Sequence, residues 1–204
     1  MLLSTPSGAY RLLRLGLLLG LAALGWPLAG RAQTKYLTKT GHLSFFSSSI
    51  MEDIEARNDK VAAAVDITTG QLAFSVPIRD FVFKRTLMQE HFNENYLESE
   101  KYPRATFTGQ VLNAQQVLRQ LAAGVQNVEV EGNLVMHGVT RKVLVSGTLG
   151  LRDGQVVMFA YFNLAPADYS IDVPLLVREH IAKSVSVRLN ATCDPVAASL
   201  SQQP

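Results

Sequence analysis

Apolar and polar residues alternate through most of this 204-residue chain. Successive side chains of a β-strand point to opposite faces, so a period of two gives each strand one apolar face. Eight segments show this period and are separated by turn residues: Lys35–Lys39, His42–Ser49, Gln71–Lys84, Arg104–Asn113, Gln126–His137, Lys142–Arg152, Gln155–Ala165 and Lys183–Cys193. The pattern predicts a mainly β protein, an antiparallel barrel or sandwich.

Helical periodicity is strong in one segment only, around "MQEHFNENYLESEKYP". Its apolar residues and its carboxylates form two stripes at a spacing of four, nearly opposite each other: Met88, Phe92 and Tyr96, and Glu90, Glu94 and Glu98. The pattern predicts a helix over Thr86–Ser99 whose aromatic side packs on the sheet and whose acidic side is solvated. Weaker patterns predict helices over Ala114–Ala123 and Pro174–Ala182.

The N-terminal residues have the pattern of a signal peptide. Two arginines precede the apolar run "LGLLLGLAALG" (Leu15–Gly25), and Gly30 and Ala32 fit the small-residue positions of a cleavage site. We therefore expect residues 1–32 to be removed and the protein to be periplasmic or secreted; an uncleaved N-terminal anchor is the alternative. No later segment approaches the ~20 apolar residues of a membrane span.

Charge and cysteine content narrow the possible functions. Removing residues 1–32 takes away three arginines and no acid, which changes 19 basic against 17 acidic side chains into 16 against 17. This balance lacks the basic surface that nucleic-acid binding requires. Cys193 is the only cysteine, so no internal disulfide can form. We expect one domain over residues 33–193 and a loose tail over residues 194–204.

Two hairpins can be registered from the sequence. Treating "GVTR" (Gly138–Arg141) as a four-residue loop places Gly132 opposite Gly147, and the two-residue turn Asp153-Gly154 places Gly147 opposite Ala160. The three small residues would then form one row on the inward face. Such a row has two interpretations: either it lets strongly curved strands bend, or it forms a groove for a slim apolar ligand.

No set of residues in the sequence indicates catalysis or metal binding. His91 and Glu94 have a workable spacing on one helix, but the HExxH pattern is absent and the other histidines are isolated. No GxSxG, GxGxxG or phosphate loop occurs. We expect a non-enzymatic protein without a metal or cofactor.

Three blocks in order resemble the YceI-like family: "MQEHFNENYLESEKYPRATFTGQV" (Met88–Val111), "VEVEGNLVMHGVTRKV" (Val128–Val143) and "DYSIDVPLLV" (Asp168–Val177). The resemblance implies an exported, eight-stranded antiparallel lipocalin-like β-barrel with short helices at its ends, able to hold a polyisoprenoid. The chain differs from better-known members at Phe45–Val65, where "H-x-G-x-x-x-G-x-F" is missing.

The resulting hypothesis is an exported carrier of an isoprenoid-like lipid or a quinone in the barrel lumen. The inward phase predicts the lining residues, with Phe92 and Tyr96 near one end: Phe45, Phe74, Val76, Phe92, Tyr96, Gly132, Leu134, Val145, Gly147, Met158, Ala160 and Phe162. The alternative is a packed barrel that acts through its outer surface. Val157, Phe159 and Tyr161 form an outward apolar patch through which such a protein could dock or form a homodimer.

Overall fold

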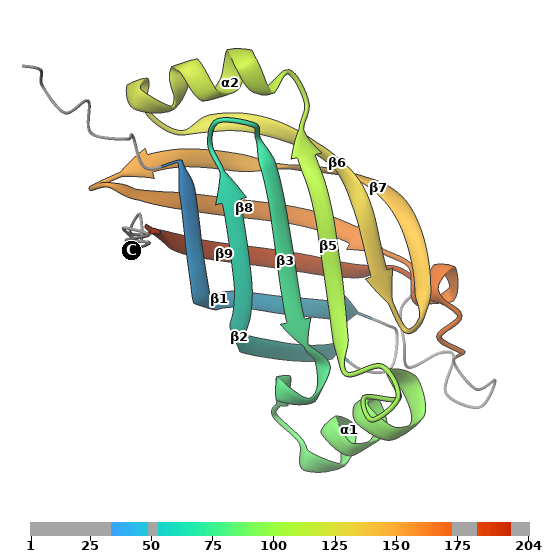
Figure 1. The fold of residues 1–204 in the computed structure, drawn as a ribbon. Helices are drawn as coiled ribbons and strands as arrows, with labels where there is room; N and C mark the ends of the chain where they lie inside the picture. Colours follow the sequence, from blue (N-terminus) through green and yellow to red (C-terminus); the bar gives the residue numbers. More distant parts are fainter. Residues whose placement is uncertain (1–33, 49–52, 173–182, 197–204) are drawn as a thin grey trace, which may run out of the picture. The chain divides into compact units, whose positions relative to one another are not determined.

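The computed structural model describes residues 34–48, 53–172 and 183–196, in which one antiparallel sheet curls and closes on itself (Figure 1). The strands are β1 Lys35–Ser48, β2 Asp53–Asp66, β3 Gln71–Pro77, β4 Val82–Phe83, β5 Arg104–Val111, β6 Gln126–Met136, β7 Val139–Arg152, β8 Gln155–Leu164 and β9 Val185–Pro195. Their order is β1-β9-β8-β7-β6-β5-β3-β2-β4, and pairing of β1 with β2 closes the barrel. The fold is therefore the predicted eight-stranded antiparallel barrel, with the short β4 as an extra strand on β2.

The barrel has the predicted eight strands, but the N-terminal strands differ from the prediction. The first two predicted strands form the single strand β1, whose pairing with β2 is irregular between Thr38 and Leu43. Strand β2 was not predicted. The predicted strand Gln71–Lys84 is interrupted by a 3-10 turn at Ile78–Asp80, which separates β3 from β4.

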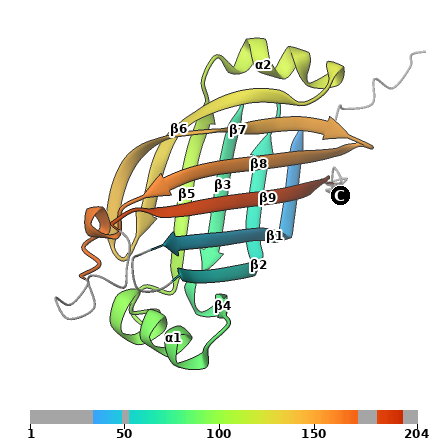
Figure 2. The ribbon, with the colours of Figure 1, turned by 180° about the vertical axis from the view of Figure 1, so that it is seen from behind.

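Two short helices lie at opposite ends of the barrel (Figures 1 and 2). Helix α1, Thr86–His91, continues into a π-helical turn, Phe92–Tyr96. Helix α2, Ala114–Gln120, continues into a 3-10 turn, Leu121–Ala123. The predicted helix Pro174–Ala182 lies outside the described residues, as does most of the predicted tail.

The predicted register of the β6–β7 hairpin is wrong by four residues. The turn contains only two residues, His137 and Gly138, both with positive φ (50° and 75°), and Met136 pairs directly with Val139. Gly132 therefore pairs with Val143, not with Gly147. The turn has the left-handed backbone of a tight two-residue hairpin, in which histidine is less common than asparagine or aspartate.

The inward faces are unaffected by this error, because a shift by an even number of residues keeps every side chain on its face. The β7–β8 register is as predicted, with Leu149 opposite Met158 and Gly147 opposite Ala160. The predicted row of Gly132, Gly147 and Ala160 is nevertheless broken, since Gly132 lies opposite Gly109 of β5 on its other side.

Candidate ligand-binding lumen

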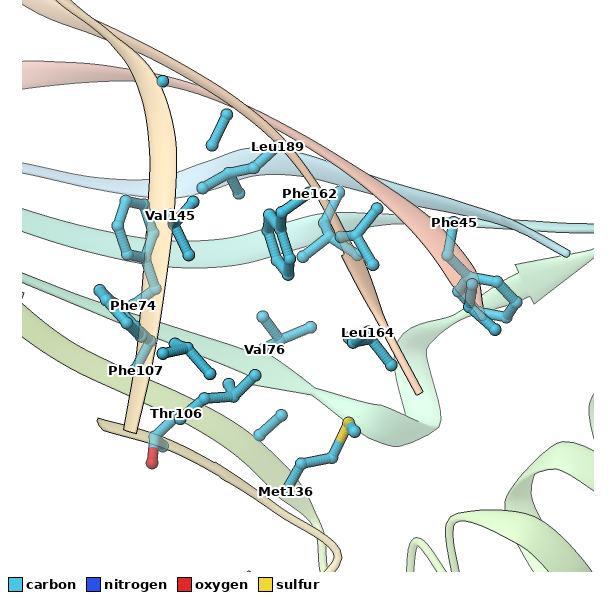
Figure 3. A pocket seen from close by; sticks show the side chains of 18 of the residues that line it. Phe45, Phe74, Val76, Thr106, Phe107, Met136, Val145, Phe162, Leu164 and Leu189 are labelled. Atoms are coloured by element: carbon cyan, nitrogen blue, oxygen red, sulfur yellow. The ribbon is translucent and has the colours of Figure 1, made fainter. Parts of the chain in front are cut away.

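The barrel encloses a cavity of about 260 Å³ (Figure 3). Eleven of the twelve predicted residues line it: Phe45, Phe74, Val76, Phe92, Tyr96, Leu134, Val145, Gly147, Met158, Ala160 and Phe162. In Figure 3 Phe45 lies at one end of the view, Phe74 and Phe107 lie at the other, and Val76 lies between them. That these side chains contact a ligand remains a prediction.

Gly132 is the exception, and its role is packing. A Cβ added there would lie 2.4 Å from the Thr108 carbonyl oxygen and 2.6 Å from the ring of Phe107. A Cβ at Gly109 would also meet the Phe107 ring, at 2.7 Å. The two paired glycines therefore make room for one phenylalanine ring. At this position the small residue serves packing within the sheet and does not form a ligand groove.

The lining is almost entirely aliphatic and aromatic. Among the described lining residues only Ser47, Tyr96, Thr106 and Thr148 carry a polar side-chain group, and none is charged. Lining residues that we had not predicted include Phe81, Phe83, Met136 and Leu189. The alternation in β9 and the change of phase after Ile78 are the sequence signals that could have identified Leu189, Phe81 and Phe83.

The two ends of the lumen are closed in different ways. At the α2 end the core is fully buried: Leu149, Val156 and Cys193 are at most 1% exposed, and Leu121 packs against the same cluster. No residue of α2 lines the cavity among those described. At the α1 end, by contrast, the cavity is bounded by side chains that are only half-buried, including Met88 and Phe92.

Residues 86–97, which we call the lid, close the α1 end through a cluster of phenylalanine rings. The Phe92 ring lies 5.7 Å from Phe45, 5.3 Å from Phe81 and 4.9 Å from Phe83, measured between ring centroids. Such tilted and stacked pairs are favourable beyond the area they bury. The lid is thus fixed to β1 and to the segment around β4 by Phe92.

Hydrogen bonds hold the lid only in part. The Phe83 N–H donates to the Gln89 side-chain oxygen at 3.2 Å, and the Asn93 side-chain amide donates to the Gln89 carbonyl at 2.9 Å. Asn93 Oδ1 is buried without a hydrogen-bond partner. An unpaired buried oxygen and a π-helical turn both lower the stability of a segment. The lid is therefore the less stable of the two closures.

Tyr96 is the half-buried tyrosine of the lid. Its burial raises the pKa of the hydroxyl above the ordinary value, because the phenolate would lose solvation. Within the described part of the chain no hydrogen bond joins this hydroxyl to another group. A neutral hydroxyl at the edge of an apolar cavity can donate to a polar group of a ligand.

The described residues contain no group of three or more His, Cys, Asp or Glu side chains that could hold a metal ion. His91 is exposed on the lid and lies beside no such group.

Cys193 is fully buried, and burial raises the pKa of its thiol to about 11. Its thiolate is therefore not formed at neutral pH, and Cys193 acts as a small apolar core residue.

In the part of the chain that the structure describes, every helix is too short or too polar to cross a membrane. The closed antiparallel barrel with an apolar interior places the protein in the lipocalin-like class. Residues 33–193 match the YceI-like domain family, and the chain belongs to that family.

Solved structures share this fold at low sequence identity. A polyisoprenoid binding domain from Saccharophagus degradans implicated in plant cell wall breakdown has a TM-score of 0.68 and 19% identity, over 80% of this chain and 99% of that one. BcnA of Burkholderia cenocepacia has a TM-score of 0.62 and 16% identity, over 74% and 95% of the two chains. A YceI protein of Campylobacter jejuni has a TM-score of 0.54 and 11% identity, over 69% and 85%. A search of curated proteins found no match.

Proposed function

We propose that this protein binds an isoprenoid-like lipid, or another lipid with a long apolar chain, in the barrel lumen and carries or sequesters it without catalysis. The observation that carries the proposal is the apolar cavity of about 260 Å³ inside the barrel. This volume lies just below the roughly 300–1,000 Å³ of typical ligand pockets, which favours a slim chain. Fold similarity to the polyisoprenoid binding domain of Saccharophagus degradans supports the same class of ligand.

The apolar lumen suits the chain of such a ligand but not its polar head group. Burying the apolar chain contributes roughly 25 cal/mol per Å², from which the cost of association is subtracted. A polar head group would lose its hydration deep in the lumen and find few partners there. We therefore place the head group, an alcohol or a quinone, at the α1 end, where the Tyr96 hydroxyl is available.

The proposed location is the periplasm or the exterior of the cell. It rests on the signal-peptide pattern of residues 1–32. An exported carrier would meet lipids released from membranes. Mass spectrometry of the mature N-terminus tests this: a chain starting at Gln33 is expected, and an intact N-terminus would favour the membrane-anchored alternative.

The alternative function uses the outer surface of the barrel. Phe159 and Tyr161 of β8 are 38% and 51% exposed, and such a patch could mediate docking or a homodimer. The cavity favours the carrier, because a barrel that acts only through its surface needs no space inside. Tyr161→Ser would abolish a dimer formed through this patch and leave lipid uptake unchanged.

A substitution that fills the lumen tests the carrier directly. Gly147→Leu is unsuitable, since a Cβ at Gly147 would lie 2.4 Å from the Phe159 carbonyl oxygen and strain the sheet whether or not the lumen is open. Val145 lines the cavity, whereas its neighbour Ser146 is exposed on the outer face. Val145→Phe and Ser146→Phe therefore place the same ring inside and outside the barrel.

The readout is the fluorescence of diphenylhexatriene, a slender hydrocarbon that emits in apolar surroundings. Val145→Phe should weaken its uptake by about tenfold or more, because the new ring occupies area otherwise available to the ligand. Ser146→Phe should bind like the wild type. Equal uptake by both variants, or a loss of about 1–3 kcal/mol of stability in Val145→Phe from overpacking, would favour a filled barrel.

A further inference from the structure

Outside the lumen, a cluster at the α1 end joins three separated segments of the described chain: the turn Glu98–Tyr102, the β6–β7 turn and the turn Pro166–Tyr169. His137 lies at the tip of the β6–β7 hairpin and its side chain is 11% exposed. Its Nε2 lies 2.7 Å from Glu98 Oε2, directly after the lid, and its Nδ1 lies 3.1 Å from the Tyr169 carbonyl oxygen. The Tyr102 ring packs edge-on against the imidazole, with centroids 4.7 Å apart.

Both ring nitrogens of His137 therefore face oxygens that can only accept hydrogen bonds. A neutral imidazole has one N–H and one lone pair, so it satisfies either Glu98 or Tyr169 and turns a lone pair toward the other oxygen. An imidazolium donates to both. Because the ring is nearly enclosed, water cannot readily replace the missing partner. The observed geometry is complete only when His137 carries two protons.

Charged groups lie on both sides of the imidazole. Lys101 Nζ lies 3.8 Å from Glu98 Oε1 and competes for the same carboxylate. Arg141 Nε donates to the Asp168 carbonyl oxygen at 2.8 Å, next to Tyr169. The Tyr169 side chain is buried, and that burial together with the nearby Asp168 carboxylate raises the pKa of its phenol, so it stays neutral.

Both partners stand on turn backbone in the left-handed region. Glu98 and His137 both have positive φ, 41° and 50°, although neither is a glycine. Residues kept in the left-handed region persist where surrounding contacts stabilise them. This also corrects the prediction of one solvated acidic stripe: Glu98 leaves the stripe of Glu90 and Glu94 and turns toward His137.

We propose that the Glu98–His137 pair is a pH-sensitive latch that fixes the lid to the β6–β7 hairpin when His137 is protonated and loosens it when the proton is lost. The latch would control access to the lumen, and in that role it rests on the proposed function. Histidine changes its charge between about pH 5 and 8. The lid is therefore held at acidic pH and released at mildly alkaline pH, which favours exchange of the lipid.

Hydrogen–deuterium exchange of the lid amides tests the latch without any ligand. At about pH 8.5, after correction for intrinsic exchange, protection of residues 89–97 should be about tenfold lower than at about pH 5.5, the size of one charge-assisted hydrogen bond. Glu98→Gln and His137→Asn should both lose this pH dependence; asparagine tolerates the positive φ of position 137. His42→Asn is the control, because His42 contacts Asp59 on the barrel wall and should keep the wild-type dependence.

Uptake of diphenylhexatriene at the two pH values provides the second measurement. The wild type should take it up about tenfold faster at about pH 8.5, and the two latch variants should show no such difference. The latch is wrong if exchange in the wild-type lid does not depend on pH, or if Glu98→Gln retains the wild-type dependence. If exchange responds as expected but no probe enters at either pH, the latch stands and the carrier function is rejected.

Discussion

Phe92 contacts three other phenylalanine rings at the α1 end of the lumen, Phe45 of β1 and the neighbouring Phe81 and Phe83. The sequence placed Phe92 on the apolar side of a helix, because the period of four is visible within one segment. The identity of its partners was not predictable. Phe81 and Phe83 reach the lumen only because the 3-10 turn at Ile78–Asp80 changes the phase of the chain.

Phe92→Ala should lower the free energy of unfolding by about 2–4 kcal/mol, somewhat less than a fully buried ring, and should also speed release of a bound probe. Urea unfolding followed by circular dichroism measures the first effect. Leu87→Ala is the matched control: Leu87 lies in the same helix and is 57% exposed, so its change should stay within about 0.5 kcal/mol. Equal losses in the two variants would contradict the account of the lid.

Gly132 shows a limit of sequence reasoning at the scale of one residue. A glycine on an inward face leaves space, but the sequence does not say what occupies it. The structure fills it with the ring of Phe107, two residues from Gly109 on the neighbouring strand. A predicted groove therefore becomes a packed contact.

At the scale of elements, strand β2 was missed for a physical reason. Its inward residues are Ala56 and Asn58 before an irregularity and Val61, Ala63 and Val65 after it, so the alternation changes phase within the strand. Asn58 is fully buried, and its side chain donates to the Pro77 carbonyl oxygen and accepts from the Lys60 N–H. A buried asparagine with satisfied hydrogen bonds looks like a loop residue in the sequence.

The β6–β7 hairpin shows why register is harder to predict than face. A four-residue loop pairs every apolar residue with an apolar one, whereas the observed two-residue turn pairs Leu134 with Arg141, so the apolar pattern does not identify the observed register. Only the turn geometry does, through positive φ at His137 and Gly138.

The two tight-turn glycines give a matched test of how this hairpin packs against Tyr102, in the turn that follows the lid. Gly138 and Gly154 have φ of 75° and 78°, but a Cβ at Gly138 would lie 2.7 Å from the Tyr102 ring, whereas nothing lies within 4 Å at Gly154. Gly154→Ala should cost about 1–2 kcal/mol, the price of a left-handed alanine. Gly138→Ala should cost about 1 kcal/mol more, because the Tyr102 ring must move. Thermal unfolding measures both; equal costs would show that Tyr102 does not pack against the turn.

On the scale of the whole molecule, the inward set of residues was largely predictable although one register and one strand were not. Each strand contributes its own alternation, and closing the sheet brings the inward faces together whichever even register is chosen. The different closures of the two ends could not be predicted. They depend on how α1 and α2 pack, which only the folded chain shows.

Uptake of an apolar isoprenoid chain by the lumen is the property on which the proposed function depends. Native mass spectrometry of the protein after organic extraction, mixed with farnesol, a short isoprenoid alcohol, tests it most directly. We expect a complex of one farnesol per chain in the wild type and in Ser146→Phe, and little or none in Val145→Phe. Absence of the complex in the wild type, or an equal amount in Val145→Phe, would contradict the claim.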